Sequence, residues 1–176
     1  LKYGREENKI YGILFDGAYL WEEYIWTILK DLNFKHPENK TGKGGINLLE
    51  KDWEVFPDFY KINNEKNIVL DTKYKRLENK DIDRNDKHQI ISYVYTLGAK
   101  IGAFIYPIKE TKEDLKSLIG KLNNSKNNGI LKASINKCGF LIPNENFKNI
   151  KEFANKIKTS EDNFKEKIEN KFQLSF

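Results

Sequence analysis

The chain has 176 residues, a mass of 20.7 kDa and a formal net charge of +5 at neutral pH. This is the length of one domain, so we expect residues 1–176 to form a single domain with one core. Aromatic residues make up 13% of the sequence, which excludes a disordered chain. The lysine excess is a modest bias towards polyanions such as nucleic acid, but a chain that is simply rich in lysine and asparagine would show it equally well.

Cys138 is the only cysteine, which excludes a disulfide framework, a cysteine-rich zinc site and a four-cysteine iron–sulfur cluster. No apolar run approaches the roughly 18 to 20 residues that a membrane span requires. We therefore expect a cytoplasmic protein with no membrane partner. The sequence contains no methionine, even at position 1, so we expect it to be part of a longer protein.

The first predicted element is a helix from about Ala18 to Leu32, with Asp16 as its N-cap. Its apolar residues recur at helical spacing and predict one buried stripe. The stripe consists of Trp21, Ile25, Ile28, Leu29 and Leu32.

Two neighbouring acids of this helix differ in their distance from the stripe. At about 100° per residue, Glu22 lies roughly 80° from the centre of the stripe, whereas Glu23 lies nearly opposite it. We predict that Glu22 sits at the rim of the core and that Glu23 is a surface residue. An acid at such a rim is by itself more often a solvated flank than a ligand.

Three strand-like runs follow, over residues 46–50, 55–62 and 67–74. A second helix is expected from a cap at Asn85 or Asp86 to about Leu97, before Gly98. The order is therefore a helix, three strands, a helix and then an apolar central strand over residues 101–108. We interpret His36 and His88 as polar surface or helix-start residues, because their spacing fits no zinc site.

The C-terminal part has weaker signals. A capping box at Thr111 and Asp114 predicts a surface helix over residues 111–122. Residues 130–135 and 138–142 are interpreted as a pair of strands. A helical tail is expected from Asn144, with a possible restart at Thr159.

A candidate site lies at the end of the third strand. Side chains alternate along a strand, so Asp71 and Lys73 share one face and Thr72 takes the other. Asp58 begins the preceding run, and the turn-rich residues 63–67 can fold it back as a hairpin partner. Two carboxylates and a lysine then meet at one sheet edge. Such carboxylates bind Mg²⁺, and a lysine beside them can orient an attacking water, which suits phosphodiester hydrolysis.

An isolated Asp-x-Lys pair on a strand is more often a surface ion pair than an active site. Its context favours the active site here: an apolar run before it, Pro57-Asp58 one hairpin earlier, and Glu22 at the rim of the preceding helix.

The motifs Pro57-Asp58 and Asp71-Thr72-Lys73, in this order of elements, resemble the PD-(D/E)xK nuclease superfamily. Residues 89–93, with Gln89 and Tyr93 four apart, resemble the QxxxY motif of its RecB-like branch. The resemblance implies an α/β restriction-endonuclease-like core, made of a helix, a three-stranded β meander, a helix and a strand. The core spans about residues 10–108, and residues 109–176 add the strand pair and the C-terminal helices.

A closer resemblance is to the C-terminal nuclease part of the McrC family, the cleavage subunits of modification-dependent restriction systems. It is carried by residues 14–16, 20–25 and 69–75, and by Asp86 ahead of Gln89. It implies a Mg²⁺-dependent DNA endonuclease, with Mn²⁺ as a possible substitute. It also implies a McrB-like AAA+ GTPase as partner, engaged through an N-terminal region for which this chain has no room.

The resemblance assigns roles to individual residues. It implies Glu22, Asp58 and Asp71 as metal-ligating acids, the backbone carbonyl of Thr72 as a further ligand, and Lys73 as the catalytic lysine. The remaining predicted residues support the site or bind the DNA backbone, and these are Gln89, Tyr93 and Lys75.

Two other functions stay open at this point. A nuclease-like subunit that binds DNA or assembles a complex, with weak or no cleavage, would keep the same fold. A repair nuclease from another RecB-like branch would keep the same motifs, and the lack of a cysteine cluster excludes the iron–sulfur members of that branch.

Overall fold

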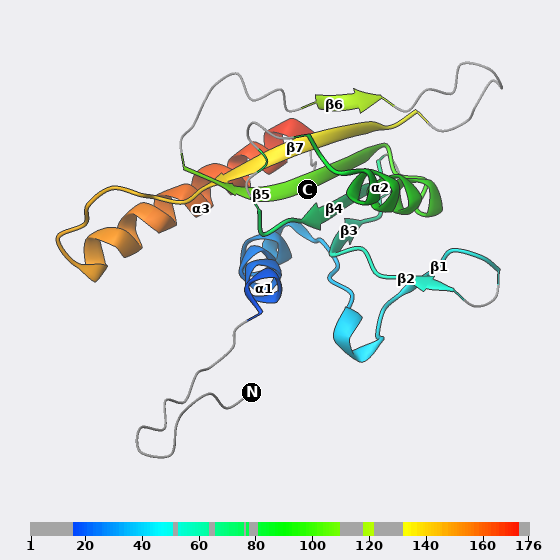
Figure 1. Ribbon diagram of the computed structural model, residues 1–176, viewed down its shortest axis with the longest axis horizontal. Helices are drawn as coiled ribbons and strands as arrows, with labels where there is room; N and C mark the ends of the chain where they lie inside the picture. Colours follow the sequence, from blue (N-terminus) through cyan, green and yellow to red (C-terminus); the bar gives the residue numbers. More distant parts are fainter. Residues whose placement is uncertain are drawn as a thin grey trace, which may run out of the picture.

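The computed structural model describes residues 16–50, 53–63, 66–75, 77, 81–109, 118–121 and 132–172, with residues 118–121 as backbone only. The described part is a mixed α/β fold with three α-helices and two sheets (Figure 1). The larger sheet has five strands in the order β3-β4-β5-β7-β6. Within these ranges, no helix combines the length and the apolar composition needed to cross a bilayer.

The centre of the large sheet is parallel. β4 (Ile68–Thr72) and β7 (Ser134–Leu141) both run parallel to β5 (Ile101–Ile108), which lies between them. β3 (Phe59–Lys61) and β6 (Leu118–Lys121) pair antiparallel at the two edges. The prediction that residues 101–108 form a central strand is confirmed.

Helices cover both faces of this sheet. α1 (Gly17–Leu29) and α3 (Ile150–Phe172) share one core with the even-numbered residues Ile68 and Leu70 of β4. α2 (Arg84–Thr96) shares a second core with Val69 on the opposite face. The alternation along β4 therefore sends successive side chains into two different cores.

The predicted first helix is confirmed, with a change at its end. Asp16 caps it by accepting a hydrogen bond from the Tyr19 amide at 3.1 Å. The α-helix stops at Leu29, and Lys30–Leu32 continues as a 3₁₀ turn that ends at Asn33 in the left-handed conformation. All five residues of the predicted apolar stripe are buried.

The expected three-stranded meander is wrong in one respect. β1 (Ile46–Asn47) and β2 (Glu54–Val55) pair with each other in a separate two-stranded sheet, so residues 46–50 do not join the core (Figure 1). The expected strand over residues 55–62 is split between β2 and β3 by residues 56–58. Pro57 has no amide hydrogen to donate to a strand ladder, which explains the break at this point.

The second helix begins earlier than predicted. Its N-cap is Asp83, whose side chain accepts a hydrogen bond from the Asp86 amide at 3.0 Å, so neither Asn85 nor Asp86 is the cap. The end near Leu97 is confirmed, and Gly98 follows with a φ of +56°.

The predictions for the C-terminal part differ from the structure in three places. Residues 118–121 form a strand rather than a helix, while residues 111–117 of the expected helix lie outside the described part. The expected strand pair is the single strand β7, because buried Asn136 finds acceptors at Ser134 and at the Gly102 carbonyl. The helical tail is one continuous helix, and it begins at Ile150.

Gly102 sets how closely α2 approaches the sheet. A Cβ atom at this position would lie 2.8 Å from Val94 Cγ2 and 2.9 Å from Ile135 Cδ1. Contacts this short force the helix or the neighbouring strand to shift.

Gly102→Ala is expected to lower the free energy of unfolding by about 1–3 kcal/mol, because the added methyl group overpacks the second core. Urea denaturation monitored by circular dichroism measures the change. Asn85→Ala, on the exposed face of α2, serves as the control and should stay within about 0.5 kcal/mol of wild type. Equal stability of the two variants would contradict the close approach.

Candidate active site

The site is built around the carboxyl end of β4. Asp71 and Lys73 leave the strand on the face covered by α2, and Lys73 Nζ lies 2.7 Å from Asp71 Oδ2. The Asp71 side chain is only 2% exposed and that of Lys73 only 16%. A carboxylate and an ammonium thus meet in a largely dry environment, as the strand alternation predicts.

Asp58 reaches β4 from the start of β3. Its Oδ2 atom accepts hydrogen bonds from both the backbone amide and the hydroxyl of Thr72, each at 2.6 Å. The antiparallel pairing of Phe59 with Leu70 makes this possible, because the same register continued by one residue sets Asp58 opposite Asp71, the neighbour of Thr72. The predicted hairpin therefore brings Asp58, Asp71 and Lys73 together.

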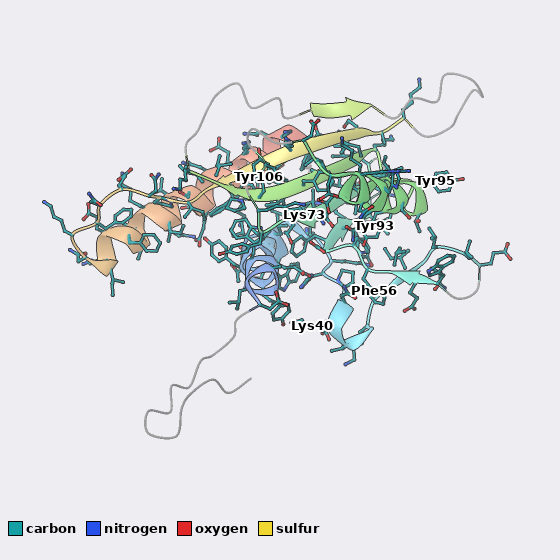
Figure 2. The ribbon with its side chains drawn as sticks, in the orientation of Figure 1. Lys40, Phe56, Lys73, Tyr93, Tyr95 and Tyr106 are labelled. Atoms are coloured by element: carbon teal, nitrogen blue, oxygen red, sulfur yellow. The ribbon has the colours of Figure 1, made fainter. Side chains whose placement is uncertain are left out.

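α2 supplies a second layer of contacts to Lys73. Its ammonium also lies 3.1 Å from Asp86 Oδ1 and donates to Gln89 Oε1 at 3.2 Å. Gln89 Nε2 donates to the Tyr93 hydroxyl, which donates to the Phe56 carbonyl at 3.2 Å. Lys73, Tyr93 and Phe56 lie in one region of the molecule in Figure 2. Gln89 thus lies against the lysine with Tyr93 behind it, and their role as supports of the site stays a prediction.

Lys75 is held by α2 as well. Its ammonium lies 2.6 Å from Asp86 Oδ2 and 2.8 Å from Asp83 Oδ2. The hydrogen bonds that Lys75 donates to these two acids raise its pKa. Its side chain is 46% exposed, so a role in binding the DNA backbone stays a prediction.

Glu22 approaches from α1 on the other face. Its side chain is 22% exposed, against 42% for Glu23, which agrees with the predicted rim position of Glu22. Glu23 is more than a surface residue, however, because its carboxylate lies 3.4 Å from Nε2 of His36. The prediction of a purely solvated Glu23 is wrong.

His36 is the residue that sequence reasoning missed. It is a site neighbour, with a side chain only 9% exposed, and not a surface residue. Its ring packs against Trp26 and Phe59, with centroids 5.3 and 4.9 Å away. Nδ1 donates to the Asp58 carbonyl at 2.8 Å and lies 3.7 Å from Glu22 Oε1. His36 therefore connects α1 to the start of β3.

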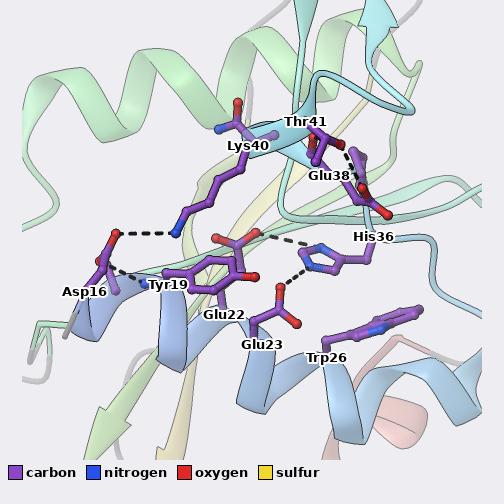
Figure 3. Close-up of a pocket in the computed structure, with 12 residues that line it drawn as sticks. Asp16, Tyr19, Glu22, Glu23, Trp26, His36, Glu38, Lys40 and Thr41 are labelled. Atoms are coloured by element: carbon purple, nitrogen blue, oxygen red, sulfur yellow. Dashed lines mark hydrogen bonds and ion pairs between the residues drawn. The ribbon is translucent and has the colours of Figure 1, made fainter.

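A cavity of about 600 Å³ opens in front of Glu22, between α1 and the loop that carries His36 (Figure 3). Tyr19 and Trp26 line it, and Lys40 reaches across it to lie 3.3 Å from the centre of the Tyr19 ring. Glu22 thus has open space on one side and the buried acids on the other.

Burial disfavours the charged forms of the three acids. The pKa of Asp71 is raised to about 8, mainly by burial and next by the charge of Asp58, against the opposing effect of Lys73. Burial and Asp58 raise the pKa of Glu22 to about 7. Burial also raises the pKa of Asp58, although the Thr72 hydrogen bonds oppose the rise. A cation near these groups would favour their charged forms.

The donor set has the chemistry of a divalent metal site. Hard oxygen ligands suit Mg²⁺ or Mn²⁺. As they stand, however, no three acidic, histidine or cysteine side chains of the described residues converge enough to hold one ion together. One oxygen of Asp58 accepts a hydrogen bond from Thr72, and the Lys73 ammonium lies against Asp71.

The fold and this edge of the sheet define an α/β protein with a cluster of buried acids and a lysine at the end of a parallel strand. The sequence profile of the McrBC 5-methylcytosine restriction system component matches residues 1–107. The chain belongs to this family, and the resemblance on its motifs is confirmed.

A solved structure, a refined half-complex from a tetradecameric assembly of Thermococcus gammatolerans McrB AAA+ hexamers with bound McrC, contains a chain of similar fold. The TM-score is 0.56 at 16% sequence identity, over 90% of this chain and 34% of the matched chain. This chain therefore spans about a third of the length of its solved neighbour. A search of curated proteins gave no match.

His36→Phe keeps a ring between Trp26 and Phe59 but removes the donor to the Asp58 carbonyl. We expect it to lower the free energy of unfolding by about 1–3 kcal/mol, because a part-buried carbonyl loses its hydrogen bond. Urea denaturation measures the loss. His88→Phe, the same substitution at an exposed position of α2, is the matched control. If both variants unfold at the same urea concentration, the connecting role of His36 is wrong.

Proposed function

We propose that this chain is a metal-dependent DNA endonuclease domain, and the nuclease part of a McrBC-like modification-dependent restriction complex. One observation carries the proposal. At the carboxyl end of β4, Asp58 is bonded to Thr72 and Asp71 lies against Lys73, and such a group of acids and a lysine supports phosphodiester hydrolysis. Membership of a restriction-system family supports it.

The proposal includes the PD-(D/E)xK core. β3 and β4 carry Pro57-Asp58 and Asp71-Thr72-Lys73, and α2 carries Gln89 and Tyr93 beside the lysine. The motifs follow one another in the order that they have in the superfamily, which supports this core, although residues 46–50 do not join the large sheet. We propose that residues 1–176 form a single nuclease domain, with its core at about 10–108.

Each residue then has a role in binding or proton transfer. Glu22, Asp58 and Asp71 would hold the ion with the Thr72 carbonyl, and Lys73 would orient the attacking water and offset charge on the phosphate. A bound Mg²⁺ or Mn²⁺ would polarise the phosphate and lower the pKa of water. Gln89 and Tyr93 would fix the position of the Lys73 side chain.

The partner is proposed from the solved neighbour, which contains McrB AAA+ hexamers with bound McrC. We propose DNA as the substrate and a McrB-like AAA+ GTPase as the partner that delivers it. A net charge of +5 is compatible with DNA binding, but it is a weak argument by itself.

Cleavage of supercoiled plasmid in Mg²⁺ or Mn²⁺ tests the activity. Asp71→Ala and Lys73→Ala are each expected to slow nicking by at least about 100-fold, because they remove a ligand and the group that orients water. Lys151→Ala, an exposed lysine of α3, is the control for lost positive charge and should cut at the wild-type rate. Metal-dependent cutting that neither site substitution changes would assign the activity elsewhere.

A nuclease-like subunit that binds DNA without cutting it is the second candidate. The observation that favours it is that no three ligands converge among the described residues. The same plasmid assay separates the two functions, since this candidate retards DNA in a gel and never nicks it.

The pair Glu22 and Glu23 tests the ligand assignment. Glu22→Gln should abolish most of the stabilisation that Mg²⁺ gives to wild type, which is about 2.7 kcal/mol at a metal concentration of 100 times Kd. Glu23→Gln, at the neighbouring position with the same chemical change, should keep it. Thermal unfolding with Mg²⁺ and then with excess EDTA measures both. Equal loss in the two variants would exclude Glu22 as a specific ligand.

A further inference from the structure

The Lys73 ammonium contacts three side chains. It lies 2.7 Å from Asp71 Oδ2, 3.1 Å from Asp86 Oδ1 and 3.2 Å from Gln89 Oε1. Only the contact to Gln89 is a hydrogen bond, and those to the two acids are ion pairs, so the charge of Lys73 is directed at groups of the protein. For Lys73 to act on a substrate, its ion pair with Asp71 must open.

Asp86 is held on α2 and contacts two lysines at once. It lies on the first turn of α2, and its amide donates to the cap residue Asp83. Its two carboxylate oxygens are shared, with Oδ1 near Lys73 and Oδ2 2.6 Å from Lys75. The side chain is 13% exposed, and each of its oxygens thus faces one lysine.

Asp71, in contrast, is the acceptor that a divalent ion would take. It is the one member of the three that the proposed function makes a metal ligand. A cation at Asp71 and the Lys73 ammonium compete for the same oxygen, because both are positive charges that cannot share it closely.

We propose that Asp86 is a positioning residue that retains Lys73 when a divalent ion takes Asp71 from it. The exchange frees one N–H of Lys73 towards the substrate side, while Asp86 and Gln89 hold the ammonium from α2. Binding of the metal ion and release of this N–H donor of Lys73 then occur together. This inference rests on the proposed metal site.

Removal of the Asp86 charge has a defined consequence. Asp71 is then the only anionic partner of Lys73 among the described contacts. A metal ion therefore displaces Lys73 from the Asp71 oxygen less readily. Asp86→Asn should therefore weaken metal binding through the lysine, although Asp86 is not a ligand. The loss of a nearby negative charge also weakens cation binding directly, and the two effects must be separated.

A double-mutant cycle in metal binding separates them. Calorimetric titration with MnCl₂ alone is carried out on wild type, Asp86→Asn, Lys73→Gln and the double variant. We expect Asp86→Asn to weaken Mn²⁺ binding about tenfold or more, as loss of a group that orients a ligand does. In the Lys73→Gln background the same substitution should change binding by less than about threefold, the direct charge effect alone.

Asp81→Asn is the matched control, since it removes the same charge from an exposed position shortly before α2. It should leave Mn²⁺ binding unchanged. Equal weakening by Asp86→Asn in both backgrounds would show a direct charge effect and overturn the proposal, as would no weakening in either.

Failure of the proposed function has a different signature. If wild type binds no Mn²⁺ and cuts no plasmid, the metal site itself is wrong, and the role of Asp86 falls with it. If wild type binds Mn²⁺ and Asp86→Asn lowers only the midpoint of thermal unfolding, the metal site stands and Asp86 is merely a helix-start residue.

Discussion

The two hydrogen bonds from Thr72 to one oxygen of Asp58 are the interaction on which the site depends. They bind the start of β3 to the end of β4, where the regular ladder between the strands has already stopped. The Asp58 carbonyl in turn receives His36, which reaches back to α1. One residue thus joins two strands and a helix, and leaves its second carboxylate oxygen for chemistry.

The sheet divides the charges of the site between its two faces. Glu22 and His36 approach from the α1 side, while Lys73, Lys75 and Asp86 gather on the α2 side. Asp71 lies between them, buried at the end of β4. The two lysines on the α2 side are paired with Asp71, Asp83 and Asp86, so this side carries no excess of positive charge.

The parts of the fold that depend on local periodicity could be predicted from the sequence. The α1 stripe and the central strand β5 follow from residue spacing alone, and both are as expected. The parts that depend on distant partners could not be predicted. Whether residues 46–47 pair with β3 or with Glu54–Val55 is decided by the break at Pro57, and buried Asn136 lies within β7 because Gly102 across the sheet accepts its hydrogen bond.

The same distinction applies to the site. Asp71 and Lys73 are two apart on one strand, so alternation was enough to place them together. His36 carries no comparable signal, since a histidine in a polar loop is an ordinary surface feature, and Asp86 is marked only by the family resemblance. Both residues contact partners that are distant in the chain. His36 bonds to the carbonyl of a residue 22 positions away. Asp86 contacts Lys73 only because α2 packs against β4. The contacts that hold the acids and the lysine in place are therefore the part of such a site that only a three-dimensional structure reveals.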